Sequence, residues 1–158
     1  MASPQTLQER ALDQACQTVL FVALELSDKR WKLAFSDGNT RRIITITAGD
    51  LVTLGEAVAK AKARFGMAGG VPIVSCYEAG RDGFWLHRSL VHCGVATVVV
   101  DASSIAVNRR ARRAKTDRVD VEQLLCLLIR SHHGETRVWS VVHVPSVEEE
   151  DARRLHRE

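Results

Sequence analysis

The chain has 158 residues, of which 46% are hydrophobic and 26% are charged, and its net charge is +3 at pH 7. This length fits one domain with a substantial core, and the composition excludes a generally disordered chain. There is no uninterrupted apolar run of about 18 residues, and the polar N-terminus has no apolar signal core, so we expect neither a membrane span nor a signal peptide.

The four cysteines are scattered along the chain and form no Cys-x-x-Cys pair. Three of them lie in apolar segments, which predicts reduced, buried thiols. Because reduced thiols indicate a reducing compartment, the expected location is the cytoplasm.

The N-terminal part of the chain predicts an antiparallel meander of three strands. Its first strand is a continuous apolar run, which is typical of a strand buried on both faces. Asp37-Gly38-Asn39 is a hairpin signal between the second and third strands. The strands are expected over residues 18–26, 30–35 and 41–47, after a lead-in over 1–17 whose residues 4–16 form either a short amphipathic helix or an irregular segment.

Beyond the meander, helical and strand patterns alternate. The expected elements are a helix over residues 51–65, a strand over 72–77, a helix over 81–93, a strand over 95–100, a helix over 116–132, and a last strand or extended segment over 137–144. The order βββαβαβα predicts an α/β fold with a mixed sheet that helices cover on both faces. Residues 18–145 would form this domain, and residues 146–158 a charged region with little to bury.

Acidic residues occur where such a sheet places active residues, at the carboxyl ends of strands and the N-termini of the following helices. Glu25 ends the first strand, Glu78 follows the strand over 72–77, and Asp117 begins the last helix. Asp120 is three residues further on, so it would share a helical face with Asp117. Carboxylates from several elements can hold Mg²⁺ or Mn²⁺ for reaction at a phosphodiester.

Each of these acids also has a structural interpretation. Glu25 can face solvent at the strand end, or pair with Lys29 or Arg30. Glu78 precedes a helix N-terminus, where the helix dipole favours an acid. The two aspartates can be ordinary first-turn acids behind an N-cap at Thr116.

A basic run leads directly into the aspartate pair. Six cations lie within ten positions, with no balancing acid before Asp117. Such a run is either a solvated face or a surface that holds a polyanion, and its position beside the acids favours contact with nucleic-acid phosphates. The six residues are Arg109, Arg110, Arg112, Arg113, Lys115 and Arg118.

Three blocks of the sequence carry these acids in settings that resemble one family. They read VALELSDKRWKLAF, CYEAGRDGFWLHRSL and VDASSIAVNRRARRAKTDRVDVEQL, and in the third Lys-Thr-Asp is followed by a second Asp three residues on. Together they resemble the DEDD-type transposases of insertion sequences, the family of the bridge-RNA-guided recombinases and Piv-type DNA invertases. The resemblance runs from about residue 19 to the end and implies an RNase H-like (RuvC-like) fold.

The resemblance also implies an activity, which is divalent-metal-dependent DNA strand cleavage in DNA transposition. It makes Glu25, Glu78, Asp117 and Asp120 the catalytic ligands of Mg²⁺ or Mn²⁺, with DNA, and in some members a guide RNA, as partner. A homo-oligomer is implied for the full-length protein.

Two departures from the family pattern accompany this resemblance. The family's first acid is normally Asp, where this chain has Glu25, and family members continue into a C-terminal domain that carries a serine nucleophile. We therefore expect a fragment or a truncated copy. Two alternatives stay open: a non-catalytic nucleic-acid-binding and assembly module for guide RNA or DNA, and a free-standing RuvC-like junction nuclease.

Overall fold

The computed structural model describes residues 18–80, 83–105 and 120–155. Within them, six strands form one sheet in the order β3-β2-β1-β4-β5-β6. They are β1 (Leu20–Glu25), β2 (Arg30–Ser36), β3 (Arg41–Thr47), β4 (Ile73–Glu78), β5 (Ala96–Asp101) and β6 (Ser140–Val141). The first three form the predicted antiparallel meander, β4 and β5 run parallel to β1, and β6 returns antiparallel to β5. The predicted mixed α/β sheet is confirmed.

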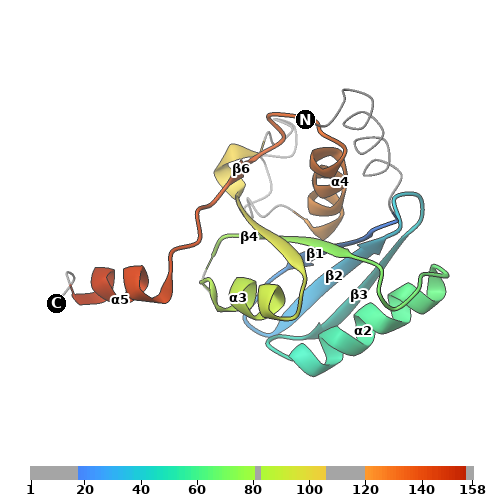
Figure 1. Cartoon of the computed structure of the whole chain (residues 1–158), viewed down its shortest axis with the longest axis horizontal. Coiled ribbons are helices and arrows are strands. Elements are labelled where there is room, and N and C mark those ends of the chain that lie inside the picture. Colours follow the sequence, from blue (N-terminus) through green and yellow to red (C-terminus); the bar gives the residue numbers. More distant parts are fainter. Residues whose placement is uncertain (1–17, 81–82, 106–119, 156–158) are drawn as a thin grey trace, which may run out of the picture.

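Helices cover both faces of this sheet, as predicted (Figure 1). In chain order they are α2 (Leu51–Arg64), α3 (Trp85–His92), the short 3-10 helix η1 (Ala102–Ser104), α4 (Val121–His132) and α5 (Val147–Leu155). α4 packs on one face, which we call the α4 face, and α2 and α3 pack on the other. No helix in the described part of the chain has the length and apolarity that crossing a membrane requires.

Strand β1 contributes to both cores, because its side chains alternate between the two faces. Phe21 and Ala23 lie in the core beneath α4, whereas Leu20, Val22 and Leu24 lie in the core beneath α2 and α3. All five are buried. The continuous apolar run in the sequence is therefore explained by burial on both faces.

The hairpin between β2 and β3 turns at the predicted Asp37-Gly38-Asn39. The Asp37 carboxylate accepts hydrogen bonds from the backbone N–H groups of Asn39 at 2.9 Å and Thr40 at 2.7 Å, and Gly38 has a φ of +98°, which favours glycine. Partial burial acts to raise the pKa of the Asp37 carboxyl, but these hydrogen bonds together lower it. The turn fixes the register of β2 against β3.

The last long helix begins later than its predicted start at Thr116. Helix α4 starts at Val121, and Asp120 has an extended backbone with φ −70° and ψ 161°. The prediction that Asp120 shares a helical face with Asp117 is therefore wrong, because Asp120 is the N-cap. A capping carboxylate accepts a hydrogen bond from a free N–H of the first turn, so the helix begins at the residue that follows the cap. Thr116 and Asp117 lie outside the described residues.

The helix predicted over residues 81–93 is also shorter, since α3 begins at Trp85. Gly83 has a φ of +60°, which a right-handed helix cannot accommodate. Among the apolar side chains of α3, Leu86 is buried, but Trp85 and Val91 have exposed fractions of 39% and 49%. Within residues 137–144, only the two-residue strand β6 forms.

The cysteines differ in their surroundings. Cys76, Cys93 and Cys126 are free thiols, but only Cys76 is buried, so the prediction of burial is wrong for the other two. Burial raises the pKa of the Cys76 thiol well above its usual range, which makes that thiol unreactive. Cys16 and the predicted lead-in over 1–17 lie outside the described residues.

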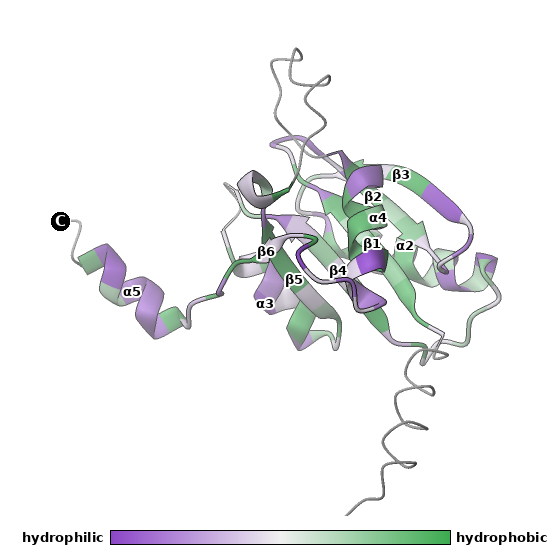
Figure 2. Cartoon of the chain, turned by 90° about the horizontal axis from the view of Figure 1, so that it is seen from above, coloured by the Kyte–Doolittle hydropathy of each residue, from purple (hydrophilic) through white to green (hydrophobic). Residues whose placement is uncertain are grey.

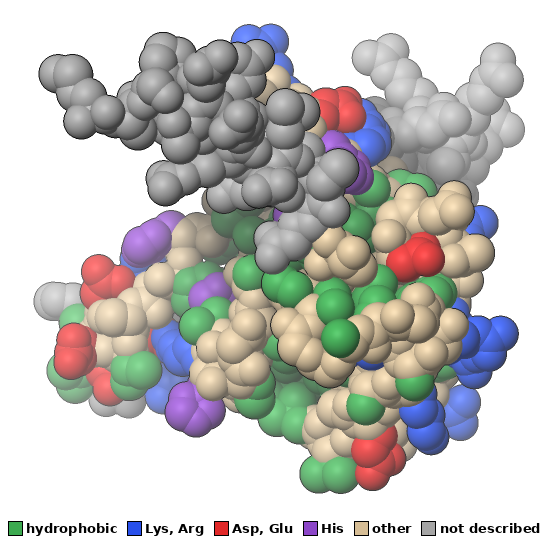
Figure 3. Space-filling model, turned by 45° about the vertical axis from the view of Figure 1, so that its right-hand side comes forward, with side chains coloured by type: hydrophobic (Ala, Val, Ile, Leu, Met, Phe, Trp, Pro, Cys, Tyr) green, Lys and Arg blue, Asp and Glu red, His purple; other side chains and the backbone are tan. Residues whose placement is uncertain are grey.

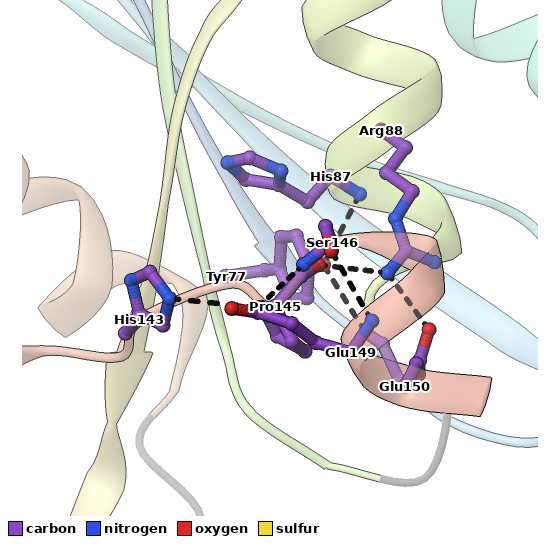
Figure 4. Close-up of polar contacts among 9 residues, drawn as sticks. Tyr77, His87, Arg88, His143, Pro145, Ser146, Glu149 and Glu150 are labelled. Atoms are coloured by element: carbon purple, nitrogen blue, oxygen red, sulfur yellow. Dashed lines mark hydrogen bonds and ion pairs between the residues drawn. The ribbon is translucent and has the colours of Figure 1, made fainter. Parts of the chain in front are cut away.

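Helix α5 lies away from the sheet (Figure 1) and has no buried residue. Its start is a capping box, in which the backbone N–H groups of Ser146 and Glu149 each bond to the other residue's side chain. Arg88 of α3 donates to the Pro145 carbonyl at 3.0 Å and to Glu150 at 2.7 Å (Figure 4). The charged segment after residue 145 is therefore helical and attached by polar contacts.

Candidate functional site at the carboxyl ends of β1 and β4

Glu25 and Glu78 are neighbours at one edge of the sheet. Each is the last residue of its strand, and β1 and β4 pair in parallel with Leu24 opposite Tyr77. The next position on both strands is an acid. Since neighbouring strands lie about 4.8 Å apart, the two carboxylates leave the sheet side by side at its carboxyl edge.

Both carboxylates lie on the α4 face. Ala23 and Cys76, two residues before each acid, belong to the core beneath α4, and strand alternation places Glu25 and Glu78 on the same side. Contact with α4 supports this placement, because Glu25 Oε2 accepts a hydrogen bond from the Val121 backbone N–H at 3.3 Å. Asp120 immediately precedes Val121, so three acids from three elements lie at this edge.

Glu25 is half-buried, and its carboxylate accepts a hydrogen bond at the N-terminus of α4. A carboxylate is stabilised there by the unpaired N–H groups and the positive end of the helix dipole. Among the described residues, Glu25 forms no ion pair with Lys29 or Arg30, so the predicted alternative of such a pair is wrong. Its actual structural role, accepting from the first amide of α4, is compatible with a further role as a ligand, because each carboxylate oxygen has two lone pairs.

Asp120 caps the same helix. Its Oδ1 accepts a hydrogen bond from the Gln123 backbone N–H at 2.8 Å, and its carbonyl accepts from Leu124 N–H at 3.0 Å. Glu25 and Asp120 therefore share the task of satisfying the first turn of α4. This common task fixes the helix end close to the carboxyl end of β1.

The capping role predicts that stability depends on the hydrogen-bond acceptor of Asp120 and not on its charge. Asp120→Ala should lower the free energy of unfolding by about 1 kcal/mol, whereas Asp120→Asn, which retains a side-chain acceptor, should cost only a few tenths. Urea unfolding followed by circular dichroism measures both. Equal losses for the two variants would contradict the capping role.

Tyr77 forms hydrogen bonds with the part of the chain that follows Glu78. Its buried hydroxyl donates to the Gly83 carbonyl at 3.2 Å and accepts from the His87 backbone N–H at 3.2 Å. Figure 4 shows the Tyr77 ring reaching toward α3 from the strand. The end of β4 and the start of α3 are thereby tied together, which restricts the position of the Glu78 backbone.

The donor chemistry of this edge fits a hard divalent cation, since carboxylate oxygens are the ligands that Mg²⁺ and Mn²⁺ prefer. Within the described residues, however, no group of three or more His, Cys, Asp and Glu side chains is placed to hold a metal ion. Asp117 and the six cations of the basic run lie outside the described residues. The predicted four-acid site thus has three members at one edge, without a complete ligand set among them.

Two charged residues near this edge, Asp101 and Lys32, were not among the predicted site residues. Asp101 ends β5, but Val100 faces α4, so Asp101 points to the opposite side, where it accepts from the Ser103 N–H at 3.0 Å. Lys32 of β2 lies directly opposite Glu25 in the β1–β2 register. The alternation of polar and apolar residues along β2 predicts which face Lys32 occupies. Its position opposite Glu25 could be predicted only if the register of β1 against β2 were known.

The chain was compared with known proteins. It is 41% identical over 146 residues to the "Putative transposase y4rJ" of Sinorhizobium fredii, an alignment that covers 88% of this chain and 36% of that protein. The chain is a homologue of a protein named as a transposase. This supports the transposase relationship that the sequence blocks indicate, and the chain spans little more than a third of that relative's length. No protein-family model matches the chain, and no solved structure matches it.

Proposed function

We propose that this chain is the N-terminal catalytic domain of a DEDD-type transposase that cleaves DNA strands with the help of a divalent metal. The observation that carries the proposal is the shared edge of three acids. Glu25 and Glu78 end neighbouring parallel strands on the α4 face, and Asp120 caps the helix whose first amide bonds to Glu25. The similarity to a protein named as a transposase supports the same class of function.

An RNase H-like (RuvC-like) fold is part of this proposal. The meander β1–β2–β3 is followed by two strands parallel to β1, with helices on both faces. This arrangement brings the carboxyl ends of β1 and β4 together, and α4 delivers Asp120 to the same place. It is the arrangement that the resemblance to the transposase family implies.

Each group would have its own task. Glu25, Glu78, Asp117 and Asp120 would hold Mg²⁺ or Mn²⁺, which when bound supplies charge stabilisation for the attacking and leaving oxygens of a phosphodiester. The Val121 N–H would orient the Glu25 carboxylate, and Tyr77 would hold the backbone at Glu78. The basic run, from Arg109 to Arg118, would bind DNA phosphates.

Calorimetric titration with Mg²⁺ tests the metal claim. We expect the wild-type chain to bind Mg²⁺ and Asp117→Ala to weaken that binding at least tenfold, because a ligand carboxylate is lost. Asp151→Ala is the matched control, because it removes the same group from the exposed helix α5. A wild-type chain that binds no Mg²⁺, or equal binding by the wild type and Asp117→Ala, would refute the claim.

One observation favours a second function, that of a non-catalytic module that binds DNA or guide RNA. The described acids do not assemble three metal-capable groups, and Glu25 already has a structural partner in Val121. This alternative predicts salt-dependent nucleic-acid binding that is lost when Arg112 and Arg113 are neutralised, without metal-dependent cutting. A free-standing junction nuclease would instead cut branched DNA without any partner domain.

A further inference from the structure

We propose that the DNA strand reaches the acids across an open corner of the α4 face, where Lys32 and Arg30 hold its phosphates. We define the open corner as Arg30 and Lys32 of β2 with Thr45 and Thr47 of β3. The proposal rests on the proposed function, because it assigns a path to the substrate of that site.

The register of the sheet places the open corner beside the acids. Lys32 pairs with Glu25 across β1 and β2, and Thr45 pairs with Lys32 across β2 and β3. Each step is about 4.8 Å, so a row of three side chains runs outward from Glu25. Arg30 and Thr47 form a parallel row at the next position on this face.

Strand alternation shows that these side chains face α4. The neighbours of Lys32 on β2, Trp31 and Leu33, lie in the core on the opposite side, as does Ile46 on β3. Ion pairing supports the assignment, because Arg41, which shares the odd-numbered face of β3, contacts Glu122 of α4 at 3.7 Å.

Helix α4 does not cover this corner. Figure 2, seen from above, shows α4 in front of the middle strands and β3 beyond it at the edge of the sheet. All four side chains of the open corner are exposed. An exposed surface that ends at a carboxylate edge suits an extended strand that must pass its backbone over that edge.

The Lys32 ammonium is available for such a contact. A cross-strand pair of opposite charges would ordinarily be read as a stabilising ion pair. Here Glu25 is instead directed to Val121, and among the described residues the Lys32 ammonium has no ion-pair or hydrogen-bond partner. A cation next to a carboxylate also offsets the repulsion between that carboxylate and an approaching phosphate.

The flanking residues extend the same chemistry. Arg30 provides a second cation with donors suited to phosphate oxygens, and the hydroxyl groups of Thr45 and Thr47 can donate to the same backbone. Contacts of this kind position a nucleic acid without reading its sequence. The open corner would therefore hold strands of any sequence.

A second basic surface lies on the opposite side of the sheet. A groove of about 440 Å³ between β3 and α2 is lined by the cations Arg42, Lys60 and Arg64, and it shares Thr45 of β3 with the open corner. Figure 3 shows Lys and Arg side chains along the right-hand rim of the molecule. Glu56 lies among these cations, and the groove faces away from the acids. It provides the matched control for the open corner.

Fluorescence anisotropy with a labelled DNA duplex of random sequence, over a series of NaCl concentrations, tests the path. We expect Lys32→Gln to weaken binding roughly fivefold and to reduce the slope of log affinity against log salt by about 1. Lys60→Gln removes the same charge from α2 on the other side of the sheet, so it should leave affinity within about twofold.

The outcomes separate the inference from the proposed function. If the wild type binds DNA but Lys32→Gln and Lys60→Gln weaken it equally, or Lys60→Gln weakens it more, the path over the open corner is refuted and DNA binding stands. A wild type that binds no DNA refutes both. Lysine acetylation followed by mass spectrometry adds an independent readout on the unmutated chain, where bound DNA should protect Lys32 but not Lys60.

Discussion

Glu78→Gln and Glu25→Gln are each expected to slow Mg²⁺-dependent nicking of supercoiled plasmid by this chain at least about 100-fold. Groups that merely orient a metal ligand contribute 10- to 100-fold, so loss of a ligand should cost at least as much. Both glutamates end parallel strands on the face that α4 covers. Glutamine preserves shape, and at Glu25 it retains an acceptor for the Val121 N–H, so folding should be preserved.

Glu148→Gln is the control for these variants. Glu148 lies on α5, which has no buried residue, and the substitution changes the net charge by the same amount. It should nick DNA at the wild-type rate. Wild-type rates for Glu25→Gln and Glu78→Gln would refute the catalytic proposal, and a wild type that binds DNA without nicking it would favour the non-catalytic module.

Much of this site could be predicted from local patterns. The apolar run before Glu25 and the short run before Glu78 identify two buried strands, and both acids occur at strand ends in the structure, as predicted. The helix between the meander and β4 predicts that β4 runs parallel to β3 and therefore to β1, whereas the pairing of β4 with β1 itself is known only from the structure. Local patterns are sufficient here because each strand is bounded by an abrupt change in composition.

Other features depend on contacts that no local pattern contains. Thr116 and Asp120 are both residue types that favour an N-cap position, so the sequence does not distinguish between them. In the structure Asp120 is the cap, at the point where the first turn of α4 contacts the Glu25 carboxylate at the end of β1. Lys32 acquires significance only when the register places it opposite Glu25. The exposure of Trp85 likewise depends on how α3 is rotated against the sheet, which its short sequence does not determine.

Leu124→Ala should lower the free energy of unfolding by about 3–5 kcal/mol, as expected for a leucine truncated in a core. Leu124 is completely buried between α4 and the sheet. The strands contribute the small side chains Ala23, Ala34 and Cys76 to the same core, together with Phe21 and Val100, so the leucines of α4 supply much of its bulk. Few neighbours can move into the cavity that alanine leaves, which places the loss at the high end for such substitutions.

Urea unfolding measures this loss, and Leu155→Ala is its matched control. Leu155 ends α5 with an exposed fraction of 78%, so the same truncation there should change stability by less than about 0.5 kcal/mol. Leu124→Met, which conserves volume, should cost under about 1.5 kcal/mol. A loss below 1 kcal/mol for Leu124→Ala would mean that α4 is not packed on the sheet as described. The placement of Asp120 and Val121 beside Glu25 would then fail with it, because packing through Leu124 is what holds that helix end at the carboxyl edge.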